Sequence, residues 1–186
     1  MSARHSREAS DADLPLLRAL ADGRHDPAAG VLYDRYARRI LALGTRLLGD
    51  RALAEDLVQE TFVGLLRAAP RFDASRGTVR ALLFTIARRS AIDLHRRRTA
   101  GPGLTTELPL ELADQGDDAF DALVAEIDLR AAMAELPEQH REMLELAYDR
   151  DLAQPAIAER LGIPLGTVKS RTSNALRALR AALDET

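Results

Sequence analysis

Apolar residues recur along most of this chain at spacings of three and four, which is the period of one face of an α-helix. The spacing predicts four helices in the first half of the chain, at Leu14–Asp22, 27–49, Arg51–Ala69 and 78–98. Five positions of the second helix are expected in the core: Tyr33, Tyr36, Ile40, Leu43 and Leu47. The pattern therefore predicts an all-α protein.

The segment Ala156–Arg171, AIAERLGIPLGTVKSR, has the pattern of two short helices joined by a tight turn. Ile157 and Leu161 fall on one buried face, and Gly162 can take the left-handed conformation of the turn without steric cost. Pro164 stands where a new helix can begin. This arrangement is typical of a helix-turn-helix, and a helical hairpin with a solvated arginine face is the alternative.

Charge divides the chain into three parts, although the net charge is only −3. Residues 1–98 carry 18 basic and 12 acidic side chains (+6), 99–128 carry 8 acidic and no basic ones (−8), and 129–186 carry 8 basic and 9 acidic ones (−1). The start of the acidic part is rich in Gly, Pro and Thr, which indicates a flexible linker. We expect two helical domains joined by this linker, with the helix-turn-helix in the second: 10–98, 99–119 for the linker, and 120–183.

Basic residues gather in two places that are suited to phosphate. Every charged side chain from Arg160 to Leu183 is basic. The helix that ends at 98 carries five arginines near its end: Arg88, Arg89, Arg96, Arg97 and Arg98. Five cations exceed what helix capping needs, so a nucleic-acid surface is expected there, with a solvated basic face as the alternative.

The remaining composition excludes several other classes of protein. The chain has no Cys, and its four His lie far apart in sequence, so no metal site and no cofactor are expected. We find no nucleophile–base pair and no phosphate-cradling glycine loop, which argues against an enzyme. No apolar window is long enough to span a membrane, and the N-terminus is too charged for a signal peptide. A cytoplasmic protein without membrane insertion is expected.

Four segments taken in order closely resemble the extracytoplasmic-function (ECF, group 4) sigma factors of bacterial RNA polymerase. They are AEDLVQETFVGLLRAAPRFD, GTVRALLFTIARRSAIDLHRRR, LPEQHREMLELAY and AIAERLGIPLGTVKSR. The resemblance runs from Leu14 to about Leu183, outside the linker. It implies a sigma factor that directs core polymerase to promoters through the −10 and −35 elements. A stand-alone helix-turn-helix regulator that acts without polymerase is the alternative.

The resemblance also implies partners and site residues. The partners are the polymerase core, through its β′ clamp coiled coil and β flap, promoter DNA, and an anti-sigma factor. The residues implied in polymerase binding are Asp56, Gln59 and Glu60. Those implied at the −10 element are Arg71, Phe72, Arg76, Arg80, Arg88, Arg89, Arg96 and Arg97, and the loop Arg71–Thr78 is implied to capture a flipped base of this element. Those implied at the −35 element are Thr167, Lys169, Ser170, Arg171, Ser173 and Asn174.

Residue chemistry suggests roles within these sets. An acid near a helix start, such as Asp56, can also be a simple partner of the helix dipole. Phe72 and Phe84 are each candidates either to stack on an unpaired base or to lie in the core. Lys169 offers a point charge for phosphate, whereas Arg171 has a fork that matches the edge of guanine. The chain departs from the family in having no Trp and in the Thr-Ser-Asn that follows Arg171.

Overall fold

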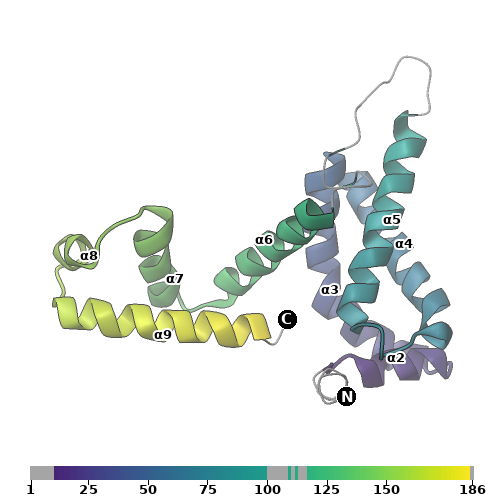
Figure 1. Cartoon of the computed structure of the whole chain (residues 1–186), viewed down its shortest axis with the longest axis horizontal. Coiled ribbons are helices and arrows are strands. Elements are labelled where there is room, and N and C mark those ends of the chain that lie inside the picture. Colours follow the sequence, from purple (N-terminus) through teal and green to yellow (C-terminus); the bar gives the residue numbers. More distant parts are fainter. Residues whose placement is uncertain (1–10, 100–108, 110–111, 113–116, 185–186) are drawn as a thin grey trace. The chain divides into compact units, whose positions relative to one another are not determined.

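The computed structural model describes residues 11–99, 109, 112 and 117–184. Every regular element among these residues is helical, which confirms the all-α prediction (Figure 1). Most of the expected linker at 99–119 lies outside the described residues. The chain divides into two compact units, one up to Val124 and one from Ala125. No helix in the described ranges is long and apolar enough to cross a bilayer.

Among the described residues, the first unit contains four complete α-helices and one short 3-10 helix. They are α2 (Leu14–Ala21), α3 (His25–Leu48), α4 (Arg51–Ala68), η1 (Ala69–Arg71) and α5 (Val79–Thr99). The first part of a further helix, α6 (Asp117–Glu135), also belongs to this unit. The bounds of α2 to α5 agree closely with the helices predicted from apolar spacing, because each helix carries local start and stop signals.

The reversal between α3 and α4 shows how these signals work. Gly49 ends α3 in the left-handed conformation, at φ 64°. Asp50 then caps α4, because its Oδ1 accepts the backbone N–H groups of Ala52 at 2.8 Å and Leu53 at 3.2 Å. A connection this short makes the two helices antiparallel neighbours.

The core of the first unit lies between α3, α4 and α5. Its fully buried large side chains include Leu32, Tyr36, Ile40, Leu43, Leu57, Leu65 and Leu83. Helix α3 lies close against α4 at Gly44, where an added Cβ would lie only 2.8 Å from the Cα of Ala54. Glycine at this position is therefore a packing requirement, not a turn signal.

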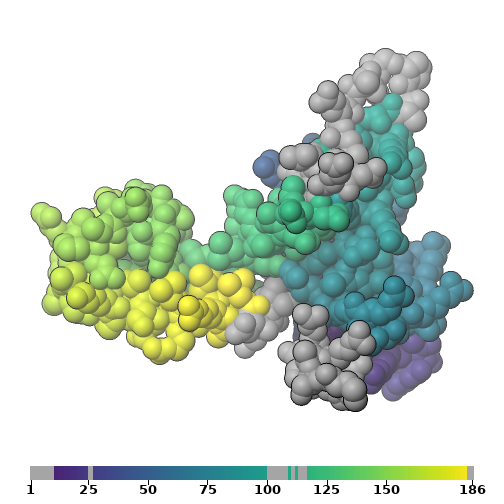
Figure 2. All heavy atoms as spheres, in the orientation of Figure 1, coloured from purple at the N-terminus to yellow at the C-terminus, as the bar shows by residue number. Residues whose placement is uncertain are grey.

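The second unit contains the rest of α6 followed by α7 (Glu138–Leu144), the π-helical turn η3 (Glu145–Asp149), α8 (Gln154–Leu161) and α9 (Leu165–Asp184). Gly162 ends α8 at φ 64°, and the carbonyl of Pro164 accepts the N–H of Thr167 at 2.8 Å to open α9. The predicted helix-turn-helix is thus confirmed. One core cluster, formed by Met143, Leu146, Ile157 and Val168, holds α8 against α9. In the space-filling view the atoms of α8 and α9 lie against each other (Figure 2).

The contact at Gly44 predicts a contrast between two glycines of α3. Gly44→Ala should lower the free energy of unfolding by about 1–3 kcal/mol, because the new methyl group overpacks the α3–α4 contact. Gly30→Ala is the matched control, since a Cβ there meets nothing within 4 Å. This control should be neutral or stabilising by up to about 1 kcal/mol. Urea unfolding of both variants tests the pair, and equal midpoints would contradict the packing argument.

Candidate nucleic-acid and protein interfaces

The three residues expected at the polymerase lie on one exposed stripe of α4. Asp56 and Gln59 are exposed, whereas Leu57 on the opposite side is fully buried. Glu60 is half-buried and already has a partner: Nη2 of Arg97 lies 2.8 Å from its Oε1 and 3.1 Å from its Oε2. The structure therefore brings the three residues together and adds an arginine from α5 beside them.

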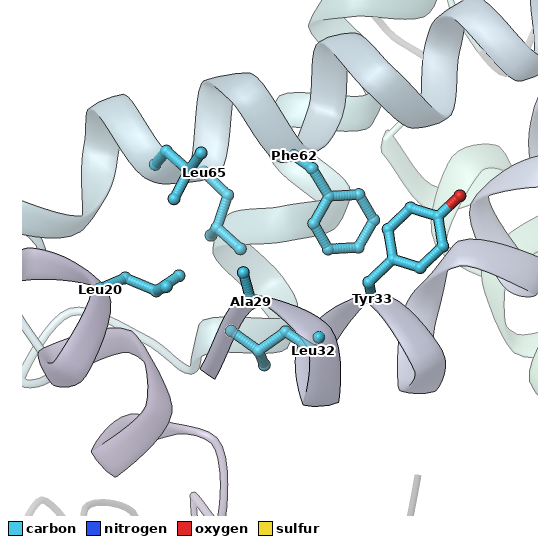
Figure 3. Close-up of a pocket in the computed structure, with 8 residues that line it drawn as sticks. Leu20, Ala29, Leu32, Tyr33, Phe62 and Leu65 are labelled. Carbon is cyan, nitrogen blue, oxygen red and sulfur yellow. The ribbon is translucent and has the colours of Figure 1, made fainter. Parts of the chain in front are cut away.

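An apolar groove of about 290 Å³ lies on the other flank of α4. Its lining comes from the end of α2, the first half of α3 and the second half of α4 (Figure 3). The residues are Leu20, Ala29, Gly30, Leu32, Tyr33, Phe62, Leu65 and Leu66. Two of the larger side chains at this groove are well exposed: Tyr33 at 50% and Leu66 at 37%.

The prediction that Tyr33 lies in the core was wrong. One face of its ring packs on Phe62, with the ring centroids 5.0 Å apart, and the rest of the side chain stays open (Figure 3). The spacing of apolar residues places Tyr33 near the buried stripe of α3, but it does not tell where the covering helices end. Sequence reasoning missed this surface for that reason.

The loop expected to engage the −10 element joins η1 to α5 and is shaped by a turn at Asp73. Its Oδ1 accepts the N–H of Ser75 at 2.9 Å, and its carbonyl accepts the N–H of Arg76 at 3.0 Å. Hydrogen bonds from the side chain and the backbone of Ser75 lower the pKa of the Asp73 carboxyl. The side chains of Arg71, at the end of η1, and of Arg76, in the loop, are exposed.

The two phenylalanines near this loop have different environments. Phe72 is half-buried and borders a hollow of about 310 Å³. The other lining residues are Leu14, Leu17, Arg18, Ala69, Asp73 and Ala74. Phe84 is only 5% exposed and packs edge-on against Tyr36, so it belongs to the core and cannot stack on a base. Arg80 covers its ring, with Cζ 5.1 Å from the centroid.

The arginines of α5 fall into groups with different surroundings. Arg88 pairs with Asp117 and lies over the ring of Phe120, with Cζ 5.3 Å from the centroid. Arg98 donates to the carbonyl of Leu48 at 2.7 Å and so satisfies the C-terminal end of α3. The other exposed arginines are Arg89, Arg96 and Arg97, of which Arg97 is bound to Glu60.

Arg89 and Arg96 share one face of α5. Their spacing of seven residues corresponds to about two helical turns, so both side chains project in nearly the same direction. Both are exposed. Of the predicted phosphate-binding residues on this helix, these two are therefore the best placed to follow a nucleic-acid backbone.

In the second unit, the buried residues of α9 show which of the predicted −35 residues point outward. Val168, Thr172 and Ala175 are buried and define the inward face. Successive residues are about 100° apart, which puts Ser173 and Arg177 on the opposite side.

The predicted −35 residues differ in exposure. The exposed ones are Lys169, Ser170, Ser173 and Asn174, and the half-buried ones are Thr167 and Arg171. Arg177 was not among the predicted residues, although the helical period places it on the outward face. Together with Lys169, Ser173, Arg180 and residues outside α9, it borders a hollow of about 380 Å³.

A second groove of the same unit, of about 890 Å³, runs between α6, α7 and α9. Leu129, Met133, Leu144, Leu176 and Leu179 give it an apolar floor, and charged residues such as Glu126 and Arg141 also line it. Leu129 is 43% exposed. An open apolar groove with charged residues beside it has the composition of a protein-binding surface.

Comparison with known proteins finds two family matches along the chain. Sigma-70 region 2 matches residues 32–101, and Sigma-70, region 4 matches residues 132–181. The first match contains most of α3 and all of α4 and α5, and the second contains α7, η3, α8 and most of α9.

Individual relatives match over nearly the full length. The chain is 35% identical over 183 residues to ECF RNA polymerase sigma factor SigK of Mycobacterium tuberculosis (strain ATCC 25618 / H37Rv), covering 96% of each protein. It is 36% identical over 159 residues to SigL of M. tuberculosis (strain ATCC 35801 / TMC 107 / Erdman), covering 83% of this chain and 88% of that protein. The solved structure of Rhodobacter sphaeroides SigE in complex with the anti-sigma ChrR is 32% identical, with a TM-score of 0.40, covering 97% of this chain and 99% of SigE.

The contacts of the arginines predict that Arg98 stabilises the fold, whereas Arg96 contributes to DNA binding. Arg98→Ala should lower the free energy of unfolding by about 1 kcal/mol, because the carbonyl of Leu48 loses its charged donor. Arg96→Ala should leave stability unchanged and weaken binding to DNA. Thermal unfolding and DNA titration of both variants test this division. Equal unfolding midpoints would show that Arg98 is not a structural residue.

Proposed function

Because the chain belongs to the extracytoplasmic-function sigma factors of RNA polymerase, we propose that its two units engage core polymerase and the two promoter elements. Regions 2 and 4 are both present in one chain, and this observation carries the proposal. The proposed extents are 10–98 for region 2, 99–119 for the linker and 120–183 for region 4. A stand-alone regulator would need only the second unit and is not favoured.

The proposed site for the β′ clamp coiled coil is the exposed stripe of α4 together with its apolar flank. Asp56 and Gln59 supply exposed polar groups, and Tyr33 and Leu66 supply exposed apolar area at the neighbouring groove. Polar residues beside a partly exposed apolar groove are typical of protein interfaces. Because Arg97 already neutralises Glu60, we expect Asp56 to be the more important carboxylate.

The groove between α6, α7 and α9 is the proposed site for the β flap. Its apolar floor and exposed Leu129 support a protein partner rather than DNA. The lining contains both acidic and basic side chains, which disfavours a polyanion. The second unit would then face polymerase through this groove and DNA through the outward face of α9.

The promoter contacts follow from exposure and chemistry. The loop at 72–78 is proposed to select the −10 base, while Arg89 and Arg96 hold the phosphates next to it. On α9, Lys169 is proposed to bind phosphate, and Arg171 and Asn174 to contact base edges. The outward position of Arg177 adds it to this surface. We also propose, from the family resemblance alone, that an anti-sigma factor restrains the protein, and that the protein acts in the cytoplasm without bond chemistry of its own.

Polymerase docking predicts that a single charge reversal on α4 weakens binding to core polymerase. Asp56→Arg should weaken binding to purified core polymerase by more than about tenfold, because it places a cation at the centre of the proposed interface. Asp118→Arg is the control, since Asp118 is exposed at the start of α6 and lies outside both the α4 stripe and its apolar groove. Core affinity, far-ultraviolet circular dichroism and promoter-dependent transcription in vitro are measured together. Equal core affinity for the two variants would remove the assignment.

The proposed −35 contacts predict different signatures for two residues of α9. Lys169→Ala should weaken holoenzyme binding about equally for all promoter variants and reduce the salt slope by roughly one. Arg171→Ala should relax preference at one base position at a cost of about 1–3 kcal/mol. Arg171→Lys is the matched control, because it keeps the charge and loses the fork. If Arg171→Ala leaves base preference unaltered, this residue only contacts the backbone.

A further inference from the structure

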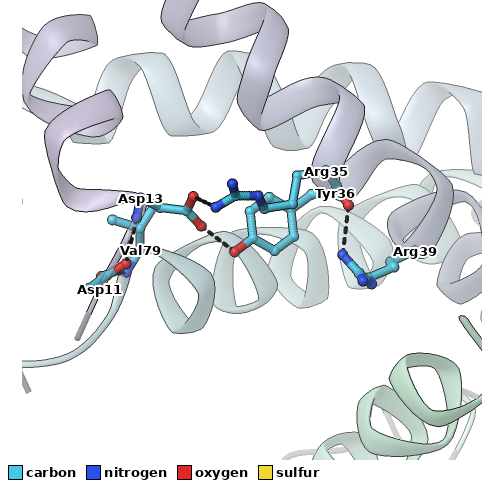
Figure 4. A network of polar contacts seen from close by, with 6 residues as sticks. All are labelled: Asp11, Asp13, Arg35, Tyr36, Arg39 and Val79. Carbon is cyan, nitrogen blue, oxygen red and sulfur yellow. Dashed lines mark hydrogen bonds and ion pairs between the residues drawn. The ribbon is translucent and has the colours of Figure 1, made fainter. Parts of the chain in front are cut away.

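A carboxylate at the start of α2 holds the first residue of α5. Oδ2 of Asp11 accepts the N–H of Val79 at 2.7 Å, across 68 positions of the chain. Its Oδ1 accepts the N–H of Asp13 at 3.1 Å, and its carbonyl accepts the N–H of Leu14 at the same distance. Asp11 therefore joins the beginning of two helices that are remote in sequence (Figure 4).

The segment that carries Asp11 is itself fixed to the core. The carboxylate of Asp13 is almost fully buried and accepts from the hydroxyl of Tyr36 and from the guanidinium of Arg35 (Figure 4). Burial, and then the hydrogen bond to Asp13, raise the pKa of Tyr36, so its hydroxyl stays a donor at neutral pH. Asp11 thus lies two residues before a carboxylate that ties this segment to α3.

Helix α2 also packs against the other end of the loop that precedes α5. Leu14 and Leu17 of α2 line a hollow together with Ala69, Phe72 and residues that follow. Ala69 is buried in η1, which leads into the loop. The first turns of α2 therefore contact the chain where this loop begins, and Asp11, just before α2, contacts it where the loop ends.

Asp11 is not needed to start α5, because that helix has a local cap as well. Oγ1 of Thr78 accepts the N–H of Ala81 at 3.1 Å. The hydrogen bond from Val79 to Asp11 satisfies a different donor of the first turn. Loss of this hydrogen bond should leave α5 formed but no longer hold the residue at which the loop ends. The bond therefore affects the geometry of the loop more than folding.

We propose that Asp11 is a positioning residue which fixes the 72–78 loop and thereby sets its preference for the −10 base. The inference rests on the proposed role of this loop in −10 recognition. Asp11 does not touch DNA in this account; it acts through Val79 and the loop. The preference for a −10 base depends on the shape of the loop, whereas the phosphate contacts of Arg89 and Arg96 do not. Replacing Asp11 should therefore change base preference and leave the overall affinity for DNA unchanged.

The test uses holoenzyme reconstituted with the full chain and a set of promoters that differ at single −10 positions. Asp11→Ala should reduce the affinity ratio between the preferred and the next base by up to about fivefold, which is the upper limit set by the net contribution of one hydrogen bond. Asp11→Asn should give an intermediate ratio, because its single amide oxygen can still accept the N–H of Val79, whereas its amide nitrogen then faces the N–H of Asp13. Asp22→Ala, at the exposed other end of α2, is the matched control.

Further readouts separate positioning from stability. Asp11→Glu keeps the charge and displaces the carboxylate by one methylene, so it should also reduce the ratio while folding and core affinity stay unchanged. If Asp11→Ala weakens binding equally for every promoter and leaves the affinity ratio between −10 bases unaltered, the inference is overturned. A loop graft at 72–78 runs in parallel: if the graft changes preference and Asp11→Ala does not, only the inference fails. If neither changes preference, the proposed role of the loop fails with it.

Discussion

The close packing of α3 against α4 at Gly44 determines the arrangement of the first unit. Because Gly44 has no side chain, the backbone of α3 comes within van der Waals distance of Ala54, and the two helices share one apolar interface. That interface fixes the rotation of α4 about its axis. Leu57 and Leu65 must then point inward, and Asp56 and Gln59 must point outward. The exposed polar stripe is a consequence of how the core closes.

A second constraint comes from polar groups that link elements remote in sequence. Asp11 and Asp13 connect the start of α2 to α3 and α5, and Arg98 connects the end of α5 to the end of α3. Each of these bonds satisfies a helix terminus or a buried carboxylate that would otherwise cost free energy. The loop at 72–78 is therefore held at its exit by a polar contact and flanked at its entry by apolar packing against α2.

The features that sequence predicted are those encoded within one or two helical turns. Apolar spacing gave the helices of the first unit, and Gly49 and Gly162 marked the helix ends because only glycine takes that backbone conformation readily. Features that depend on tertiary contacts were not predictable in this way. Examples are the exposure of Tyr33, the burial of Phe84 and the cap from Asp11 to Val79. The candidate interface residues were found through family resemblance, and only the structure shows which of them already have partners.

These partners change what the basic cluster of α5 can contribute. Five arginines close together suggest a large attraction for DNA, but Arg88, Arg97 and Arg98 are bound to Asp117, Glu60 and the carbonyl of Leu48. The pair of Arg97 with Glu60 joins the proposed DNA surface to the proposed polymerase surface. An exposed ion pair contributes at most about 1 kcal/mol, or about fivefold in an equilibrium constant. Coupling between the two surfaces through this pair is therefore weak, and each surface can bind its own partner with nearly its full affinity.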